Sequence, residues 1–261
     1  MSKLITYHEQ GDIGYITLSR PEKRNALNSA MVEEFQRVLP VQNAPPWIIL
    51  SGEDCFCAGA DLSEWVALSF DPQKMQEITQ RARGLFQQLY NHPSRLIAAI
   101  ERLALGGGAE LSYACDYRIA GEHAKIGQPE VTLGFSPGAY ATRFLPERIG
   151  FQHAAELVLT GRQITAREGY EIGLVDLVVE DGQARAAAEE FTRNPRDTQP
   201  KVSCSREESL QLQWDPQGIV PEYTYRAARC ALRDPSKEYA FFLETLLNEE
   251  TKRRITKRFG R

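Results

Sequence analysis

Three consecutive glycines and two glutamates form the stretch of the chain best suited to chemistry. The glycines occupy positions 106–108, and Glu110 and Glu130 follow them. The apolar run at 95–100 predicts a buried strand, and the pattern at 107–115 predicts a helix that starts at the glycines. Such a helix start leaves backbone N–H groups free and carries the positive end of the helix dipole. The stretch therefore predicts an oxyanion hole beside an acid/base pair.

Each glutamate also has an ordinary structural interpretation. In the first turn of a helix, Glu110 would usually be a solvated residue that complements the dipole. Because it follows Gln128-Pro129, Glu130 would usually be a charged residue of a loop. However, Leu111, Ala114 and Cys115 predict that the helix carrying Glu110 is largely buried. A buried carboxylate is costly unless it has a partner or a chemical task.

Composition limits the classes of function. The chain has 261 residues, 42% hydrophobic and 25% charged, with a net charge of −4. These values are typical of a soluble globular protein and disfavour a general nucleic-acid binder. No apolar run reaches the roughly 18–20 residues that span a bilayer. The first residues contain no apolar signal core, so we expect a cytoplasmic protein that binds no membrane.

Metal and nucleotide motifs are missing from the sequence. The five cysteines suggest no disulfide framework, and Cys55-x-Cys57 has no second Cys/His pair at ligand spacing. The motifs HExxH and GxxxxGK[ST] do not occur. The six-residue frame that opens at Gly106 ends on Leu111, where a dinucleotide fingerprint needs glycine. We therefore expect no metal.

Strand and helix patterns alternate up to about residue 200 and are only helical beyond it. Expected strands are at 13–19, 47–50, 95–100, 117–120, 124–127 and 174–179. Expected helices are at 28–39, 73–91, 107–115, 138–144, 152–159, 165–171, 183–191, 206–212, 221–232 and 237–258. One more helix is expected to begin at residue 62. A polar segment with prolines at 195 and 200 separates the two parts. The sequence thus predicts an α/β core at 1–200 and a helical region at 201–261.

Six motifs occur in a characteristic order along residues 10–180. They are SRPEKRNAL at 19–27, FCAGADL at 56–62, LGGGAEL at 105–111, CDYRIA at 115–120, GQPEVTLGFSPGA at 127–139 and LTGRQITAREGYEIGLVD at 159–176. Together they resemble the enoyl-CoA hydratase/isomerase (crotonase) superfamily. The resemblance implies a crotonase-like spiral of ββα units with a C-terminal helical trimerisation region. It also implies a homotrimer or a dimer of trimers, and a coenzyme A thioester as substrate, with no separate cofactor.

The resemblance assigns roles to five residues. The backbone N–H groups of Ala60 and Gly107 would form the oxyanion hole. The two-glutamate hydratases of the family suggest Glu110 as the base toward water and Glu130 as the acid toward the α-carbon. The N–H group of Gly138 matches a position that holds the reacting water.

Further positions are candidates for substrate binding. Lys23 and Arg24 match a region that lies along the pantetheine and nucleotide of coenzyme A, although both could be exposed turn charges. Lys257 is the nearest match to a lysine placed over the nucleotide phosphates of a neighbouring subunit, and a solvated helix end is the simpler interpretation. Asp61 is also a candidate N-cap. The full set is Lys23, Arg24, Ala26, Ala58, Gly59, Asp61, Leu62, Trp65, Phe135, Tyr140 and Lys257.

The chain departs from the family pattern at three places. Glu101-Arg102 stands where Asn-Gly is usual, Tyr140-Ala141 replaces Gly-Gly, and Arg143-Phe144 replaces Gln-Arg. Trp65, Phe135 and Tyr140 are bulky side chains that could narrow or reshape the acyl pocket.

Hydration of a 2-enoyl thioester is the leading functional hypothesis. A double-bond isomerase needs only one carboxylate as proton shuttle, so the presence of both glutamates disfavours it. A decarboxylase or hydrolase acting on a coenzyme A or carrier-protein thioester remains open, because function depends on the site rather than the fold. A non-catalytic thioester-binding or RNA-binding relative is disfavoured by the charge pair and the net negative charge.

Overall fold

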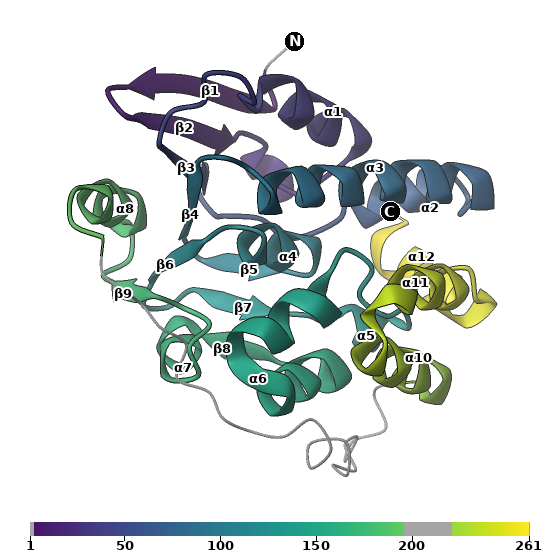
Figure 1. Cartoon of the computed structure of the whole chain (residues 1–261). Helices are drawn as coiled ribbons and strands as arrows, with labels where there is room; N and C mark the ends of the chain where they lie inside the picture. The colour runs from purple at the N-terminus through teal and green to yellow at the C-terminus, as the bar shows by residue number, and fades with distance from the viewer. Residues whose placement is uncertain (1–2, 196–220, 261) are drawn as a thin grey trace. The chain divides into compact units, whose positions relative to one another are not determined.

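Six strands form the main sheet, in the order β1-β2-β3-β4-β6-β9 (Figure 1). The first two pair antiparallel, and every later pair is parallel. The strands are β1 (Ile5–Gln10), β2 (Ile13–Leu18), β3 (Trp47–Gly52), β4 (Arg95–Ile100), β6 (Tyr117–Gly121) and β9 (Leu177–Val179). The long apolar runs of β3 and β4 suit strands that have a parallel neighbour on each side and are covered on both faces. The sequence predicted all of these strands except β1, and it predicted β9 as longer than it is.

The computed structural model describes residues 3–195 and 221–260, which group into two compact units. Unit 1 comprises Met1–Ala60, Gly84–Ile126 and Ile164–Lys201, and unit 2 comprises Asp61–Arg83, Gly127–Gln163 and Val202–Arg261. The predicted boundary near residue 200 lies outside the described residues, as does the predicted helix at 206–212. The division into 1–200 and 201–261 therefore stays a prediction.

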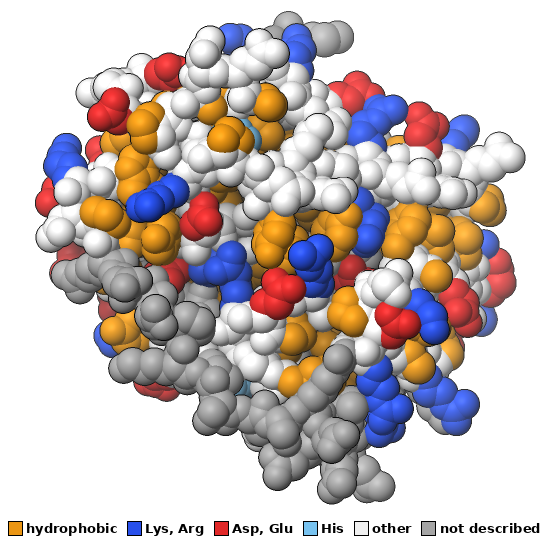
Figure 2. Space-filling model, viewed as in Figure 1, with side chains coloured by type: hydrophobic (Ala, Val, Ile, Leu, Met, Phe, Trp, Pro, Cys, Tyr) orange, Lys and Arg blue, Asp and Glu red, His pale blue; other side chains and the backbone are white. Residues whose placement is uncertain are grey.

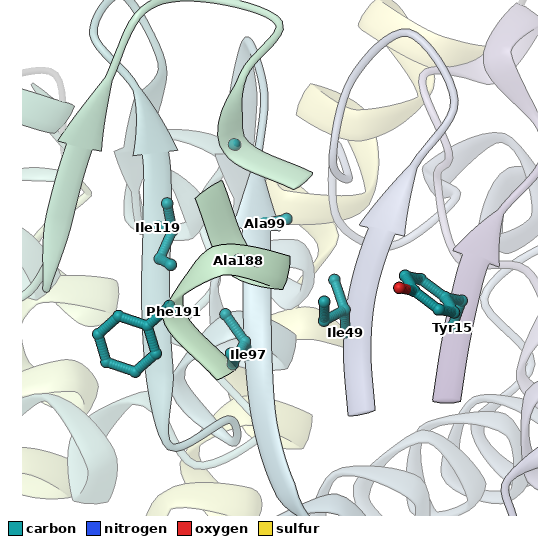
Figure 3. Close-up of a cluster of buried hydrophobic side chains, with 8 residues drawn as sticks. Tyr15, Ile49, Ile97, Ala99, Ile119, Ala188 and Phe191 are labelled. Carbon is teal, nitrogen blue, oxygen red and sulfur yellow. The ribbon is translucent and has the colours of Figure 1, made fainter. Parts of the chain in front are cut away.

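The hydrophobic core of unit 1 includes a cluster between the main sheet and helix α8 (Ala184–Arg193), shown in Figure 3. Phe191 contacts the aromatic rings at the edge of this cluster, with centroids 4.8 Å from Tyr117 and 6.5 Å from Trp47. The sheet contributes residues at alternate positions of its strands, so that one face is covered by the helix. The clustered residues are Tyr15, Ile49, Ile97, Ala99, Ile119, Ala184, Ala188 and Phe191.

The remaining elements of unit 1 are helices, a 3-10 turn and the strands of a smaller sheet. Helix α1 (Ser29–Val38) begins as predicted, because the Asn28 side chain accepts a hydrogen bond from the Met31 N–H at 2.9 Å. A smaller sheet has the order β5-β7-β8. The other elements are η1 (Pro21–Lys23), β5 (Leu103–Leu105), α4 (Gly107–Tyr113), β7 (Lys125–Gly127), β8 (Gln163–Thr165) and α7 (Ala166–Glu171).

Unit 2 is helical, and its C-terminal helices lie side by side in Figure 1. Helix α10 packs against α5 and α6, and α12 packs against α2 and α5. The elements are α2 (Leu62–Ala67), α3 (Pro72–Tyr90, which continues into unit 1), α5 (Glu130–Leu133), α6 (Ala141–Thr160), α10 (Glu222–Arg233), η2 (Pro235–Lys237), α11 (Glu238–Leu246) and α12 (Glu249–Phe259). The chain therefore has a mixed α/β fold with a C-terminal helical region.

One helix prediction in this unit was wrong, and another was confirmed. The single helix expected at 237–258 is divided into α11 and α12, because Asn248 accepts a hydrogen bond from the Glu250 N–H at 2.9 Å and starts a new helix. The two separate helices expected at 138–144 and 152–159 are confirmed: α6 starts at Ala141, and the backbone leaves the helical conformation at Gly150, where φ is 73° and ψ is 163°, so one helix lies on each side of that residue.

Charges of both signs are interspersed over the face drawn in Figure 2. Exposed ion pairs of the described residues include Arg143 with Glu147 and Arg193 with Glu190. No helix within residues 3–195 and 221–260 has both the length and the apolar character needed to cross a membrane.

Candidate active site

The loop that carries Ala60 is held from two sides within unit 1. On one side the Leu27 N–H donates to the Gly59 carbonyl at 2.7 Å, and the Ala58 N–H donates to the Arg24 carbonyl at 3.0 Å. On the other side the Cys57 peptide is bonded to β5, with its N–H donating to Leu103 O at 3.1 Å and its carbonyl accepting from Leu105 N at 3.0 Å. Backbone ladders on both sides make this loop rigid.

The backbone segments that carry the nitrogens of Ala60 and Gly107 lie close together. A Cβ built on Gly107 would lie 3.6 Å from the Ala60 nitrogen, and one built on Gly59 would lie 3.3 Å from the Gly107 nitrogen. Gly59 has φ +99°, and its added Cβ would come within 2.6 Å of the Leu105 carbonyl, so only glycine fits there. Within residues 3–195 and 221–260, no acceptor of the chain takes a hydrogen bond from the N–H of Ala60 or Gly107. The two donors are thus preorganised for an oxygen atom.

Glycine is also required at position 108, on the inner side of the same helix start. A Cβ there would lie 2.3 Å from the Cys57 carbonyl oxygen. Helix α4 therefore packs directly on the loop that carries Ala60. The triple glycine serves this close approach as well as the backbone turn at Gly106, where φ is 53°.

Asn25 organises the same loop, and the sequence analysis missed it. The side chain is fully buried. Its Nδ2 donates to the carbonyls of Glu53 (2.9 Å) and Cys55 (2.6 Å), and its Oδ1 accepts from the Arg20 N–H at 2.7 Å. The Cys57 thiol donates to the Asn25 carbonyl at 3.1 Å. Asparagine after a turn often adopts the left-handed backbone conformation, and its side chain then hydrogen-bonds to nearby backbone groups. Asn25 does so, with φ 54°.

Glu110 occupies the first turn of α4, as predicted. Its backbone N–H donates to the Gly106 carbonyl at 2.9 Å, and its side chain is only 2% exposed. The rest of the helix is buried as well, from Gly108 to Tyr113. The prediction that this helix lies in the core is confirmed, and the solvated interpretation of Glu110 is excluded.

Glu130 is the first residue of α5 in unit 2 and is 6% exposed. Burial, together with a smaller contribution from the negative charge of Glu238, raises its pKa to about 8, while its own backbone N–H opposes the shift. The Gln128 amide, oriented so that its nitrogen faces the carboxyl group, donates to Oε1 at 3.0 Å. That bond also favours the charged form, but loss of hydration dominates, so Glu130 holds a proton near neutral pH. Because Glu110 belongs to unit 1 and Glu130 to unit 2, their pairing stays a prediction.

Gly138 lies in a loop that the C-terminal helices hold in place. A Cβ at Gly138 would lie 2.3 Å from Cγ of Phe242 in α11. The guanidinium of Arg83 donates to the Gly138 carbonyl, and Glu238 accepts from the backbone N–H of Tyr140 at 2.8 Å. Arg83 and Glu238 were not among the predicted residues, since nothing in their local sequence distinguishes them from ordinary helix charges.

Three aromatic side chains of unit 2 form one packed cluster. The ring of Trp65 lies 5.7 Å from that of Phe135 and 6.2 Å from that of Phe242, all with steep interplanar angles. Each is at most 5% exposed. The bulky residues Trp65 and Phe135 are thus brought together as neighbours. Asp61 caps α2 by accepting from the Ser63 N–H at 3.1 Å, which confirms its predicted structural role.

The other predicted substrate-binding residues differ in exposure. Lys23 and Arg24 are exposed in and after the η1 turn, and Lys257 is exposed on α12. Ala26 and Leu62 are buried, and Ala58 is half-buried. Contact with substrate stays a prediction for all of them. Among the described residues, no group of three or more His, Cys, Asp or Glu side chains is placed to hold a metal ion.

The unusual pair Glu101-Arg102 has structural roles in unit 1. Glu101 Oε1 accepts from the Ala184 N–H at 2.8 Å and so caps the start of α8. Arg102 has φ 58° and forms an exposed ion pair with Asp54, with Nη1 and Oδ1 2.6 Å apart. This departure from the family pattern therefore supports the fold at the edge of the main sheet.

The chain is similar in sequence to known proteins. A family model described as enoyl-CoA hydratase/isomerase matches residues 8–221. An enoyl-CoA isomerase/hydratase of Mycosarcoma maydis is 40% identical over 63% of this chain and 64% of its own length. A short-chain-enoyl-CoA hydratase of Clostridium acetobutylicum is 35% identical over 72% of this chain and 73% of its own length. The chain thus spans about two thirds of the length of these curated relatives.

A solved structure extends the likeness to nearly the whole chain. The crystal structure of an enoyl-CoA hydratase from Bacillus anthracis superposes with a TM-score of 0.69 and 31% identity, covering 98% of this chain and 89% of that one. The motifs that build the loop around Ala60 and the start of α4 lie inside the region matched by the family model. By its sequence and by its crotonase fold, the chain belongs to the enoyl-CoA hydratase/isomerase family.

Proposed function

We propose that the chain is an enoyl-CoA hydratase that adds water across the 2,3 double bond of an acyl-CoA thioester. The observation that carries this proposal is that the N–H groups of Ala60 and Gly107 lie close together in unit 1 and donate to no acceptor within residues 3–195 and 221–260. A thioester carbonyl bound there would gain negative charge as it becomes an enolate. Donors already in place stabilise that charge more in the transition state than in the ground state.

The two glutamates would supply the proton transfers. Glu110, as base, takes a proton from water, and the water oxygen adds to C3 of the enoyl group while the double-bond electrons move toward the thioester oxygen. Glu130, as acid, then delivers its proton to C2, and the thioester carbonyl re-forms. The raised pKa of Glu130 supports this division, because that group holds a proton at neutral pH. Gly138 would hold the water through its N–H.

A double-bond isomerase is the second candidate, and the Mycosarcoma relative carries that activity in its name. Isomerisation shuttles one proton between C2 and C4 and needs no bound water. The buried state of both glutamates favours hydration, since a second buried carboxylate would have no task in an isomerase.

Substrate choice separates the two candidates. With a short 2-enoyl-CoA, a hydratase removes the conjugated-thioester absorbance and yields a 3-hydroxyacyl-CoA. With a 3-enoyl-CoA, an isomerase creates that absorbance without forming a hydroxyacyl product. Isomerisation of the 3-enoyl substrate together with no hydration of the 2-enoyl substrate would replace the first proposal with the second.

The oxyanion hole can be tested separately. Ala60→Pro removes one N–H donor, and losing such a donor typically costs about 3–4 kcal/mol of barrier. Turnover should therefore fall by at least about a hundredfold, whereas unchanged turnover would refute the assignment of Ala60.

We also propose that the protein works as a homotrimer or a dimer of trimers, as the family resemblance implies. Light scattering of the purified protein measures the assembly directly, and a monomeric mass would contradict this proposal.

A further inference from the structure

Tyr140 has a backbone conformation that disfavours a tyrosine. Its φ is 81°, in the left-handed region, where a side chain crowds the backbone and glycine is preferred. It is also the N-cap of α6, and its own side chain caps nothing. Two residues before it is Gly138, so the conformation at Tyr140 affects the orientation of the proposed water-binding N–H.

Glu238 of α11 holds this conformation from one side. Its Oε2 accepts from the Tyr140 N–H at 2.8 Å, and its Oε1 accepts from the Thr142 N–H at 2.9 Å. The carboxylate is fully buried, so it bridges the cap and the first turn of α6 as a substitute for a capping side chain. Two charge-assisted bonds on neighbouring backbone donors leave the peptide at Tyr140 little freedom.

Arg83 of α3 holds the loop from the other side. Its guanidinium carbon lies 4.1 Å from the centroid of the Tyr140 ring and 4.8 Å from that of the Tyr239 ring, so it packs between the two. The same group donates to the Gly138 carbonyl and lies 3.4 Å from Glu238 Oε2. One side chain thus contacts the strained residue, the glycine and the buried carboxylate.

We propose that Arg83 and Glu238 form a clamp of positioning residues that holds Tyr140 in its left-handed conformation and thereby orients the Gly138 N–H. The clamp compensates for a tyrosine at a position that favours glycine. This inference rests on the proposed hydratase function for its effect on catalysis. Its effect on the loop stands independently of catalysis.

Glu238→Gln tests the clamp, because the amide keeps the shape but can accept only one of the two N–H bonds. Once released, Tyr140 should leave its left-handed conformation in most molecules. The fraction of molecules in which the Gly138 N–H is correctly oriented, and hence kcat, should then fall about tenfold, with KM changed less than about twofold. The same substitution is then made in a Tyr140→Gly background, where no strain needs to be held. There Glu238→Gln should lower kcat less than about threefold. An equal loss in both backgrounds would overturn the clamp.

Two further variants guard the interpretation. Arg83→Lys retains the charge but cannot pack flat between two rings and reach the carbonyl as well, so its effect should also shrink in the Tyr140→Gly background. As a control, Glu147→Gln removes an exposed carboxylate from α6, the helix that Tyr140 caps, and should leave kcat unchanged. If Arg83→Lys has the same effect in both backgrounds, Arg83 has no part in holding Tyr140.

Amide hydrogen exchange tests the loop without any assay of activity. The N–H groups of Tyr140 and Thr142 should exchange about tenfold faster in Glu238→Gln than in the unsubstituted protein. Unchanged exchange would refute the clamp even if hydration is confirmed. Absent hydration with faster exchange would instead refute the proposed function and leave the clamp standing.

Discussion

Asn25→Asp is a near-isosteric change that tests how the loop that carries Ala60 is held. The Oδ1 atom keeps its bond from the Arg20 N–H, but the second carboxylate oxygen replaces an amide that donates to the carbonyls of Glu53 and Cys55. Two donor bonds are then replaced by oxygen–oxygen repulsion. The backbone strain is unchanged, since both residue types tolerate a φ of 54°.

The expected cost follows from burial. The bond to the Cys55 carbonyl is fully buried and the bond to the Glu53 carbonyl is partly buried. A buried polar group left unsatisfied costs about 1–3 kcal/mol, so we expect about 2–4 kcal/mol of lost stability for the pair. Guanidinium denaturation at neutral pH measures this loss as a lower midpoint.

Asn28→Asp is the matched control three positions along the chain. Asn28 caps α1 by accepting from the Met31 N–H, and aspartate performs that role equally well, so the change should stay within about 0.5 kcal/mol. Equal destabilisation by the two substitutions, or a loss below about 0.5 kcal/mol for Asn25→Asp, would refute the assignment of Asn25 as the organiser of the loop.

Three other predictions follow from the same geometry. In Gly107→Ala the added methyl group meets only ordinary van der Waals contacts, so the protein should fold normally but lose turnover, because that group lies beside the Ala60 N–H. In Gly108→Ala the added methyl group would press on the Cys57 carbonyl, so this substitution should lower the melting temperature instead. Because the acid form of Glu130 is needed and its pKa is about 8, kcat/KM should fall about tenfold per pH unit above that value, and a flat profile to about pH 10 would contradict the role of Glu130 as the acid. Glu101→Ala removes the cap of α8 and should cost about 1 kcal/mol in thermal unfolding with no change in KM, so an unaltered melting temperature would count against that cap.

Much of the sheet could be predicted because its signal is local. The apolar runs of β3 and β4 are typical of strands buried on both faces of the sheet, and the alternating pattern of β2 is typical of a strand buried on one face. The short elements β5 and α5 were missed because few residues carry their pattern, and β1 was missed because only Ile5 among its six residues is buried. The split between α11 and α12 was missed because Asn248 lies in an otherwise helical sequence.

The family resemblance pointed to the loop that carries Ala60, while the residues that hold this loop could not be predicted. Ala60 and Gly107 lie in glycine-rich segments whose composition already indicates a close backbone approach. Asn25 lies in a charged turn, and its buried contacts form with a loop about thirty residues away. Arg83 and Glu238 are 155 positions apart, and the sequence shows no spacing that would pair them.

The most direct test of the central claim is the hydration of a short 2-enoyl-CoA by the unsubstituted protein and by Glu110→Gln and Glu130→Gln. General acid or base catalysis contributes about a hundredfold to ten-thousandfold each, so each variant should lose at least about a hundredfold in kcat. The double variant should fall less than the product of the two losses, because the pair acts as a unit. Full activity in either single variant would contradict the two-carboxylate mechanism.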